Sequence, residues 1–441
     1  MVGACALACA MVTGCATRFD THRAEVRALY AAGGFAAARD AMEQPEIRRR
    51  YDDKNVALWW MDIGSLSLAM GDTQRAIQAL NNAEAIMDQR RSETLAESLG
   101  VLLINDSQRP YLGEPYEEMY LNVLKMLAHL LEGNIVGGAT VEARRMAVKA
   151  NILRDRYLQY VAETRETSTL AGRVRPESLG GVVAVNEAGE FIESPLGLFL
   201  TAVTFMHADE RENQRVAARR LLEAIRVQRG LVGQVDSAPF AGLEDIEPGD
   251  VNALVVVFSG QGPTKRRFPV GPLIIDGASI YFELPVLRVT PSAASRVRIL
   301  VDGKFVAEAP LIEDMARVAE ENHRRQLPLI YVRTLLRAAA KSFGVREGYR
   351  AVERSTDNEF ARLGALLGGL LFVVTTERAD LRAWETLPGR AFALLLDLEP
   401  GERVFTIEWA SADGRVLERS APRVVDVPPD GLATISGHWP R

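Results

Sequence analysis

The chain has 441 residues, of which 48% are hydrophobic and 25% are charged, as is usual for folded globular domains. This composition excludes a collagen-like, a disordered and a polytopic membrane protein. The formal net charge is −6, from 52 Lys and Arg against 58 Asp and Glu, without long runs of one sign. The sequence therefore lacks the basic footprint of a protein that binds nucleic acid.

The N-terminus contains all 3 cysteines of the chain, Cys5, Cys9 and Cys15. Residues 1–14 are uncharged and match the apolar region of a secretory signal, but they are too few to span a bilayer. Residues 12–15 (VTGC) resemble a bacterial lipobox, whose cysteine is lipidated and becomes the first mature residue. We therefore expect a signal peptide at 1–14, lipidation of Cys15 and sorting to the outer membrane. The alternative is an incidental apolar start on a cytosolic helical protein. No positive charge precedes residue 18, which departs from the usual signal and suggests a start codon farther upstream.

Residues 15–225 are predicted to form a helical repeat domain, because their apolar side chains recur at helical spacing. Short breaks at 33–34, 71–72, 133–134 and near Asp209 divide this region into four helical hairpins. Gly34 and Gly71 lie 37 positions apart (71 − 34), close to the 34-residue tetratricopeptide period. The later breaks are farther apart, so a helical bundle without repeats is the alternative.

The second half is predicted to be rich in strands. Residues 226–250 are rich in Gly and Pro and are expected to form a linker. Residues 251–310 and 388–437 contain β-type runs, which predict one β-sandwich-like domain interrupted by a helical insertion at 311–387. The expected fold class is therefore α+β, with a tetratricopeptide-like helical domain followed by this β-domain.

The sequence offers no pattern typical of catalysis, of a cofactor site or of a metal site. The five histidines include no pair at i,i+3 or i,i+4, and the G-x-S-x-G pattern of a serine nucleophile is absent. Residues 259–265 (SGQGPTK) lack the four-residue spacer of a phosphate loop and are expected to form a turn between strands. The apolar stretch 363–376 is too short to span a membrane and is interpreted as a buried helix and strand start, with membrane contact or a partner surface as alternatives.

Several segments resemble a family of uncharacterised bacterial lipoproteins with tetratricopeptide-like helices. They are, in collinear order, 111–122 (YLGEPYEEMYLN), the 133–134 turn, 141–145 (VEARR), 194–197 (SPLG), 259–265, and 379–384 (ADLRAW) ahead of 386–388. The resemblance implies an outer-membrane envelope protein whose partners are other envelope proteins, such as proteins of peptidoglycan synthesis or other outer-membrane lipoproteins.

Six residues within these segments are candidates for partner binding: Tyr111, Glu114, Tyr116, Glu117, Arg144 and Arg145. Pro115 is suited to open a helix whose first turn carries the acidic residues 117 and 118. The arginines at 144 and 145 could pair with this acidic patch across a hairpin, and a peptide- or glycan-binding site is the alternative. Arg382 and Trp384 lie two positions apart and are expected to form a cation–π pair.

The sequence favours a non-enzymatic, lipid-anchored periplasmic protein that acts as a protein-binding scaffold or assembly factor in the cell envelope. Two alternatives remain open, an envelope glycan-modifying hydrolase and a structural subunit of an envelope complex. Neither a cofactor nor a nucleic-acid partner is expected.

Overall fold

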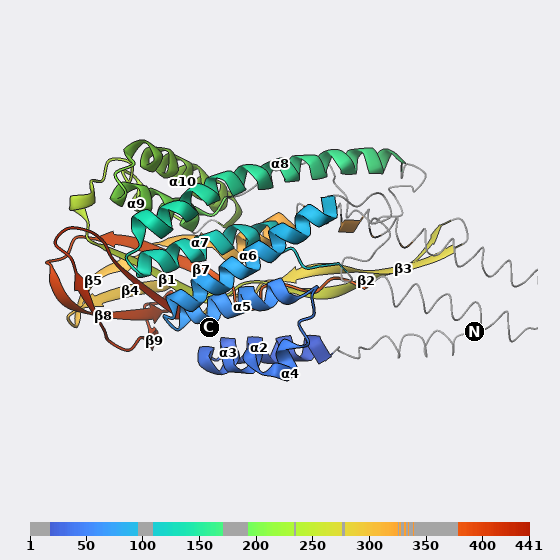
Figure 1. Ribbon diagram of the computed structural model, residues 1–441, viewed down its shortest axis with the longest axis horizontal. Helices are drawn as coiled ribbons and strands as arrows, with labels where there is room; N and C mark the ends of the chain where they lie inside the picture. The colour runs from blue at the N-terminus through green and yellow to red at the C-terminus, as the bar shows by residue number, and fades with distance from the viewer. Residues whose placement is uncertain are drawn as a thin grey trace, which may run out of the picture.

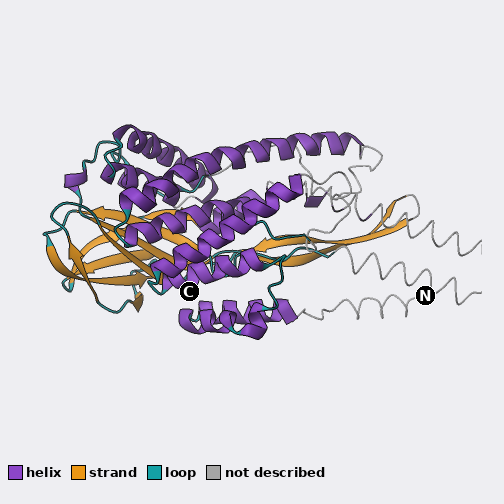
Figure 2. Cartoon of the chain, viewed as in Figure 1, coloured by secondary structure: helices purple, strands orange, loops and turns teal. Residues whose placement is uncertain are grey.

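A computed structural model describes residues 18–95, 109–170, 193–232, 235–275, 278–324 and 378–441, with a few isolated residues between 326 and 338. The predicted signal peptide, Cys15 and the apolar stretch 363–376 lie outside the described residues. The fold is mixed α+β, with helices in the N-terminal half and sheets in the C-terminal half (Figure 2). None of the helices in the described part of the chain has the length and apolar character of a membrane span.

Helices pack as consecutive pairs, α2 with α3, α5 with α6, α7 with α8, and α9 with α10. Each pair is joined at a predicted break, where Gly33, Gly71, Gly133 and Asp209 adopt a positive φ. Glycine takes this conformation without the steric cost that a Cβ atom brings. The bounds of the helices are α2 (Arg18–Ala31), α3 (Phe35–Glu43), α4 (Pro45–Arg48), α5 (Val56–Ala69), α6 (Thr73–Leu95), α7 (Pro115–Leu131), the π-helical turn η3 (Ile135–Ala139), α8 (Thr140–Leu170), α9 (Pro195–His207), α10 (Arg211–Val232), and the 3₁₀ turns η5 (Ala238–Phe240) and η6 (Pro248–Asp250).

The strands form three sheets. The first has the order β11-β1-β7-β6, the second has the order β10-β8-β4-β5 with β9 also paired to β8, and the third is the β2-β3 hairpin. The bounds are β1 (Ala253–Gln261), β2 (Thr264–Ile275), β3 (Ala278–Arg288), β4 (Arg296–Val301), β5 (Lys304–Ala309), β6 (Leu311–Asp314), β7 (Pro388–Leu396), β8 (Gly401–Ala410), β9 (Val416–Arg419), β10 (Arg423–Val427) and β11 (Ala433–Trp439). As predicted, the first sheet joins segments that are far apart in sequence, because β1 pairs with both β7 and β11.

The core has three layers, with helices on one face of the first sheet and the second sheet on its other face (Figure 1). Strand β1 lies at the centre and contributes alternate side chains to each interface. Leu254 and Val256 pack toward the helices, whereas Val255 and Val257 pack toward the second sheet. Burial on both faces accounts for the uninterrupted apolar run of this strand.

The structure departs from the sequence prediction in three places. Helix α10 continues to Val232, inside the predicted linker 226–250, because the buried side chain of Gln228 binds the main chain of Ile312 and Asp314 in β6. The β2-β3 hairpin forms its own sheet and extends away from the two larger sheets (Figure 2). Neither end of the predicted helical insertion 311–387 is helical, since 311–314 pairs with β7 and 378–387 contains no helix.

Candidate partner-binding site

Helix α7 begins as the sequence predicts, with Pro115 in its first turn. Glu114 and Glu117 form a capping box, in which each side chain binds the other residue's backbone N–H; the Glu114 N–H lies 2.8 Å from the Glu117 carboxylate. This arrangement satisfies donors that the first turn of a helix leaves without intrahelical partners. The carboxylate of Glu117 also accepts a hydrogen bond from the Tyr111 hydroxyl.

Four of the six candidate residues make contacts inside the protein. Tyr111, Tyr116 and Glu117 are 5%, 2% and 1% exposed, so the structure does not place these three side chains on the surface where a partner would bind. Glu114 is half-buried and forms an ion pair with the buried ammonium group of Lys265 in β2. The sequence singled out the segment 111–117, but most of its candidate side chains point into the fold, because the segment 378–387 packs over them.

The segment 378–387 contains neither helix nor strand, and it docks on the N-terminal helices through buried polar groups. The backbone N–H of Trp384 donates to Glu117 of α7 at 2.7 Å, and its indole N–H donates to Ser65 of α5 at 3.0 Å. The backbone N–H of Thr386 donates to Asp62 of α5 at 3.1 Å. The buried carboxylate of Glu385 forms an ion pair with Arg23 of α2. One segment thus connects three helices to the start of β7.

The expected cation–π pair of Arg382 and Trp384 is not formed. The Arg382 guanidinium lies 5.1 Å from the ring centroid of Tyr111 and pairs with Asp380 at 2.7 Å. The indole of Trp384 is buried against α5 instead. Each of the two side chains contacts residues of its own instead of the other side chain. The spacing of Arg382 and Trp384 in the sequence does not indicate which distant residues lie next to them.

Burial controls the protonation of the carboxyl groups at this junction. Burial and, to a smaller extent, the charge of the nearby Glu385 raise the pKa of Asp62 to about 7, although the hydrogen bonds from Thr386 act in the opposite direction. Burial likewise raises the pKa of Glu117 to about 6 and that of Glu313 in β6 to about 7. Glu313 binds the Ser194 hydroxyl and, at 3.0 Å, the Leu196 N–H at the start of α9. None of these three carboxyl groups lines the groove described next.

The remaining two candidates, Arg144 and Arg145, line an open groove between α6 and α8 with a volume of about 790 Å³. Helix α7 packs on both of these helices (Figure 1), and none of its residues lines the groove. The wall on the α8 side carries Val148 and Ile152, which are 60% and 42% exposed. Exposed apolar side chains that share a groove mark a site of interaction more often than isolated ones do.

Beneath the groove lies a buried charge network. The ammonium group of Lys125 in α7 is fully buried, 2.6 Å from Glu84 of α6 and 2.9 Å from Glu142 of α8. Burial alone would raise the pKa of Glu84, but Lys125 and Lys149 outweigh this effect and hold it at about 2. The three helices are thereby linked through their charges, and a lysine in the middle of the apolar run of α7 was the sequence signal for this network.

The predicted ion pairs of Arg144 and Arg145 with the acidic patch of α7 are wrong. Arg144 pairs with Glu210 at 2.6 Å, and Arg145 pairs with Glu142 at 2.9 Å. Glu118 is paired with Arg91 and Arg156 instead. Both candidate arginines are more than half exposed, at 62% and 52%, and therefore remain accessible at the rim.

Within the described part of the chain, no group of three or more His, Cys, Asp or Glu side chains is arranged to hold a metal ion. Comparison of the chain with protein-family models, with curated proteins and with solved structures gave no match.

The raised pKa of Asp62 predicts a pH-dependent contribution to stability. The folded protein binds this proton with a pKa of about 7, whereas an unfolded chain binds it near pH 3.9, so stability from this group is gained as the pH falls between these values. Relative to Asp62→Asn, the wild type should gain up to about 1.4 kcal/mol per pH unit below pH 7. Chemical denaturation at pH 5, 6 and 7.5 measures this difference.

Asp53→Asn provides the matched control, because it makes the same substitution at an exposed residue outside the buried junction. Histidine titration affects all variants equally and cancels in the comparison. A constant stability difference between the wild type and Asp62→Asn across this range would contradict the assignment.

Proposed function

We propose that the protein is a lipid-anchored periplasmic lipoprotein of the bacterial outer membrane that acts, without catalysis, as a scaffold for another envelope protein. The observation that carries this proposal is the groove between α6 and α8. It combines exposed apolar side chains with a charged rim, whereas the buried carboxyl groups with raised pKa lie elsewhere in the contacts between helices and sheets.

The groove fits an amphipathic helix from the partner. Val141, Val148 and Ile152 are seven and four positions apart on α8 and therefore lie along one face of that helix. A partner helix with apolar residues at i, i+3, i+4 and i+7 would bury this face, as in other complexes in which a helix occupies a groove. The opposite wall supplies Asp88 of α6, whose side chain is 60% exposed and favours a basic residue on the polar side of the partner.

The finer description of the fold belongs to the same proposal. The helix pairs with turns at Gly33, Gly71 and Gly133 support an irregular tetratricopeptide-like array. Such arrays stack helical hairpins and present extended binding surfaces. The apolar cluster shared by the first and second sheets supports a β-sandwich-like domain behind them.

The anchor is supported by the lipobox-like residues 12–15, with Cys15 three positions before the first described residue of α2. An acyl chain contributes about 0.8 kcal/mol per buried CH₂, so that two or more chains hold a protein stably at a membrane. Attachment at the first mature residue would keep the helical region near the membrane surface.

Metabolic labelling with a lipid precursor tests the anchor. The wild type and Cys9→Ala should both incorporate the label and fractionate with outer membranes, because Cys9 lies in the predicted signal. Cys15→Ala should lose the label and leave the membrane fraction. Label retained by Cys15→Ala would refute lipidation at this position.

A photo-crosslinking amino acid at Ile152, introduced in cells of the native host, tests the groove. We expect one discrete adduct with an envelope protein, and Val148→Asp should reduce it at least tenfold because a charge would enter an apolar interface. Val136→Asp is the matched control, since Val136 is 72% exposed in η3 but does not line the groove. Equal adduct from both aspartate variants, or no adduct, would count against a partner in this groove.

A further inference from the structure

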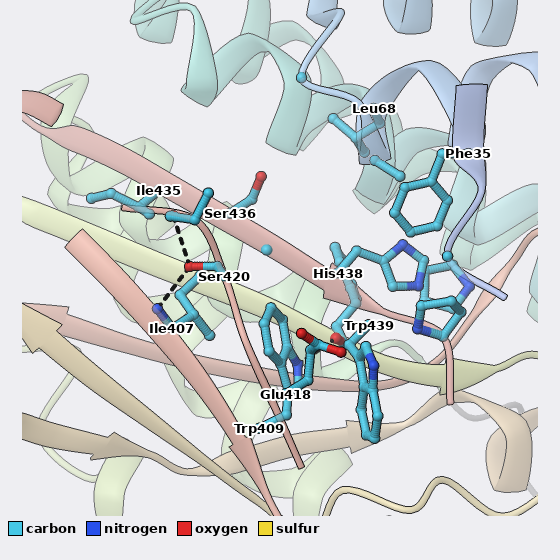
Figure 3. Close-up of a pocket in the computed structure, with 18 of the residues that line it drawn as sticks. Phe35, Leu68, Ile407, Trp409, Glu418, Ser420, Ile435, Ser436, His438 and Trp439 are labelled. Atoms are coloured by element: carbon cyan, nitrogen blue, oxygen red, sulfur yellow. Dashed lines mark hydrogen bonds between the residues drawn. The ribbon is translucent and has the colours of Figure 1, made fainter. Parts of the chain in front are cut away.

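A second cavity, of about 360 Å³, lies at the edges of the two larger sheets, where they meet the turn between α2 and α3. Its walls come from β11 with the residues that follow it, from the end of β8, and from the chain between β9 and β10 (Figure 3). None of the residues that line it lines the groove between α6 and α8. The proposed scaffold function does not use this cavity.

Aromatic side chains form much of its lining. The indoles of Trp409 and Trp439 lie on one side of the cavity, and Phe35 lies beside His438 on another (Figure 3). The rings of Phe35 and His438 are stacked with their centroids 5.3 Å apart. The indole N–H of Trp409 already donates to the Phe258 carbonyl at 3.0 Å, so this side chain offers a ligand only apolar contact.

Strand β11 presents a free edge to the same cavity. It pairs in parallel with β1 on one side, and among the described residues no strand pairs with its other side. The N–H of Ala433 donates to Asn252 beside β1, so that the alternate residues Ser436 and His438 direct their N–H and C=O groups away from β1. The guanidinium of Arg423 reaches the outward carbonyl of Ser436 at 3.2 Å, which is consistent with this register.

Positive charge predominates around this edge. The lining contains Arg419, Arg423 and Arg441 but a single acidic residue, Glu418. Arg419 shares the carboxylate of Glu408 with Arg298, so two guanidinium groups face one buried carboxylate. Arg423 donates to a main-chain carbonyl, which leaves its charge available to a carboxylate on a ligand.

We propose that this cavity binds an extended acidic peptide segment of a partner protein, which adds to the first sheet beside β11. The peptide backbone would pair with the outward N–H and C=O groups of Ser436 and His438, in the manner of β-strand addition. An apolar side chain would fill the space beside Trp409 and Trp439. A carboxylate on the peptide would pair with Arg423 after its bond to the Ser436 carbonyl is exchanged for a peptide N–H.

A peptide fits these features better than a glycan does. Main-chain groups at two-residue intervals match the repeat of an extended peptide, which is about 6.6–6.8 Å per two residues. Recognition of sugar hydroxyls would need several side-chain donors and acceptors aimed into the cavity, whereas the Trp409 indole N–H is already bonded and Glu418 is the one carboxylate in the lining.

The test uses the full chain and four fluorescent probes in titrations followed by anisotropy. The probes are an alternating peptide of valine and glutamate (VEVEVEVE), its lysine counterpart (VKVKVKVK), the glutamate peptide with alternate backbone amides N-methylated, and an oligomer of N-acetylglucosamine. The glutamate peptide should bind at least tenfold more tightly than the lysine peptide. Methylation on the edge that faces β11 should abolish binding, because it removes the ladder donors.

Two variants locate the site, and both leave the backbone hydrogen bonds between paired strands in place. Arg423→Gln should weaken binding of the glutamate peptide at least fivefold, whereas Arg415→Gln, at an exposed arginine outside the lining, should not. Ser436→Pro removes an outward N–H without removing a bond to β1, a change that edge strands tolerate. It should also weaken binding, with an unchanged circular dichroism spectrum as evidence of folding.

The outcomes separate the possibilities. Binding of the glutamate peptide that is lost in Arg423→Gln and Ser436→Pro establishes strand addition at β11. The proposal is overturned if no peptide binds, if the lysine or the methylated peptide binds equally well, if neither variant weakens binding, or if only the sugar oligomer binds. These results do not depend on a partner in the groove between α6 and α8.

Discussion

Buried carboxyl groups need hydrogen-bond partners inside the protein, and here those partners lie on segments far away in sequence. Glu117 and Asp62, on the N-terminal helices, accept the backbone N–H groups of Trp384 and Thr386. Glu313, on the first sheet, accepts the N–H of Leu196 at the start of α9. Leaving such a buried group without its hydrogen-bond partner commonly costs about 1–3 kcal/mol, and more when the group is charged, so this requirement favours one way of docking the helices on the sheets.

The two proposed binding surfaces depend on this docking in different ways. The two helices that border the groove, α6 and α8, both pack on α7, whose first turn is held by the contact of Glu117 with the segment 378–387. The cavity beside β11 combines residues of the α2–α3 turn with strands of both larger sheets, so it exists only while the helices are docked. A protein built in this way can present two surfaces in a fixed relation to each other.

Local features of the fold were predictable from sequence, and long-range pairings were not. The turns at Gly33, Gly71 and Gly133, the helix start at Pro115 and the β4-β5 turn at residues 302–303 follow from backbone preferences that act over a few residues. Periodicity also indicates which residues are buried, but it does not indicate which distant segment supplies their partners. For that reason Tyr111 and Glu117 were identified as important but assigned to an external partner. The exposed apolar residues of α8 were overlooked because that helix is mostly polar and lacks a distinct apolar face.

Differential scanning calorimetry of the full chain measures most directly whether the segment 378–387 joins helices and sheets into one cooperative unit. Chains of this length often unfold in separate steps, so a single transition would distinguish one cooperative unit from independently unfolding parts. The account predicts a single transition with equal calorimetric and van't Hoff enthalpies, which Glu117→Ala shifts as a whole to lower temperature. Two transitions in the wild type, or a Glu117→Ala variant in which only one part melts earlier, would contradict it.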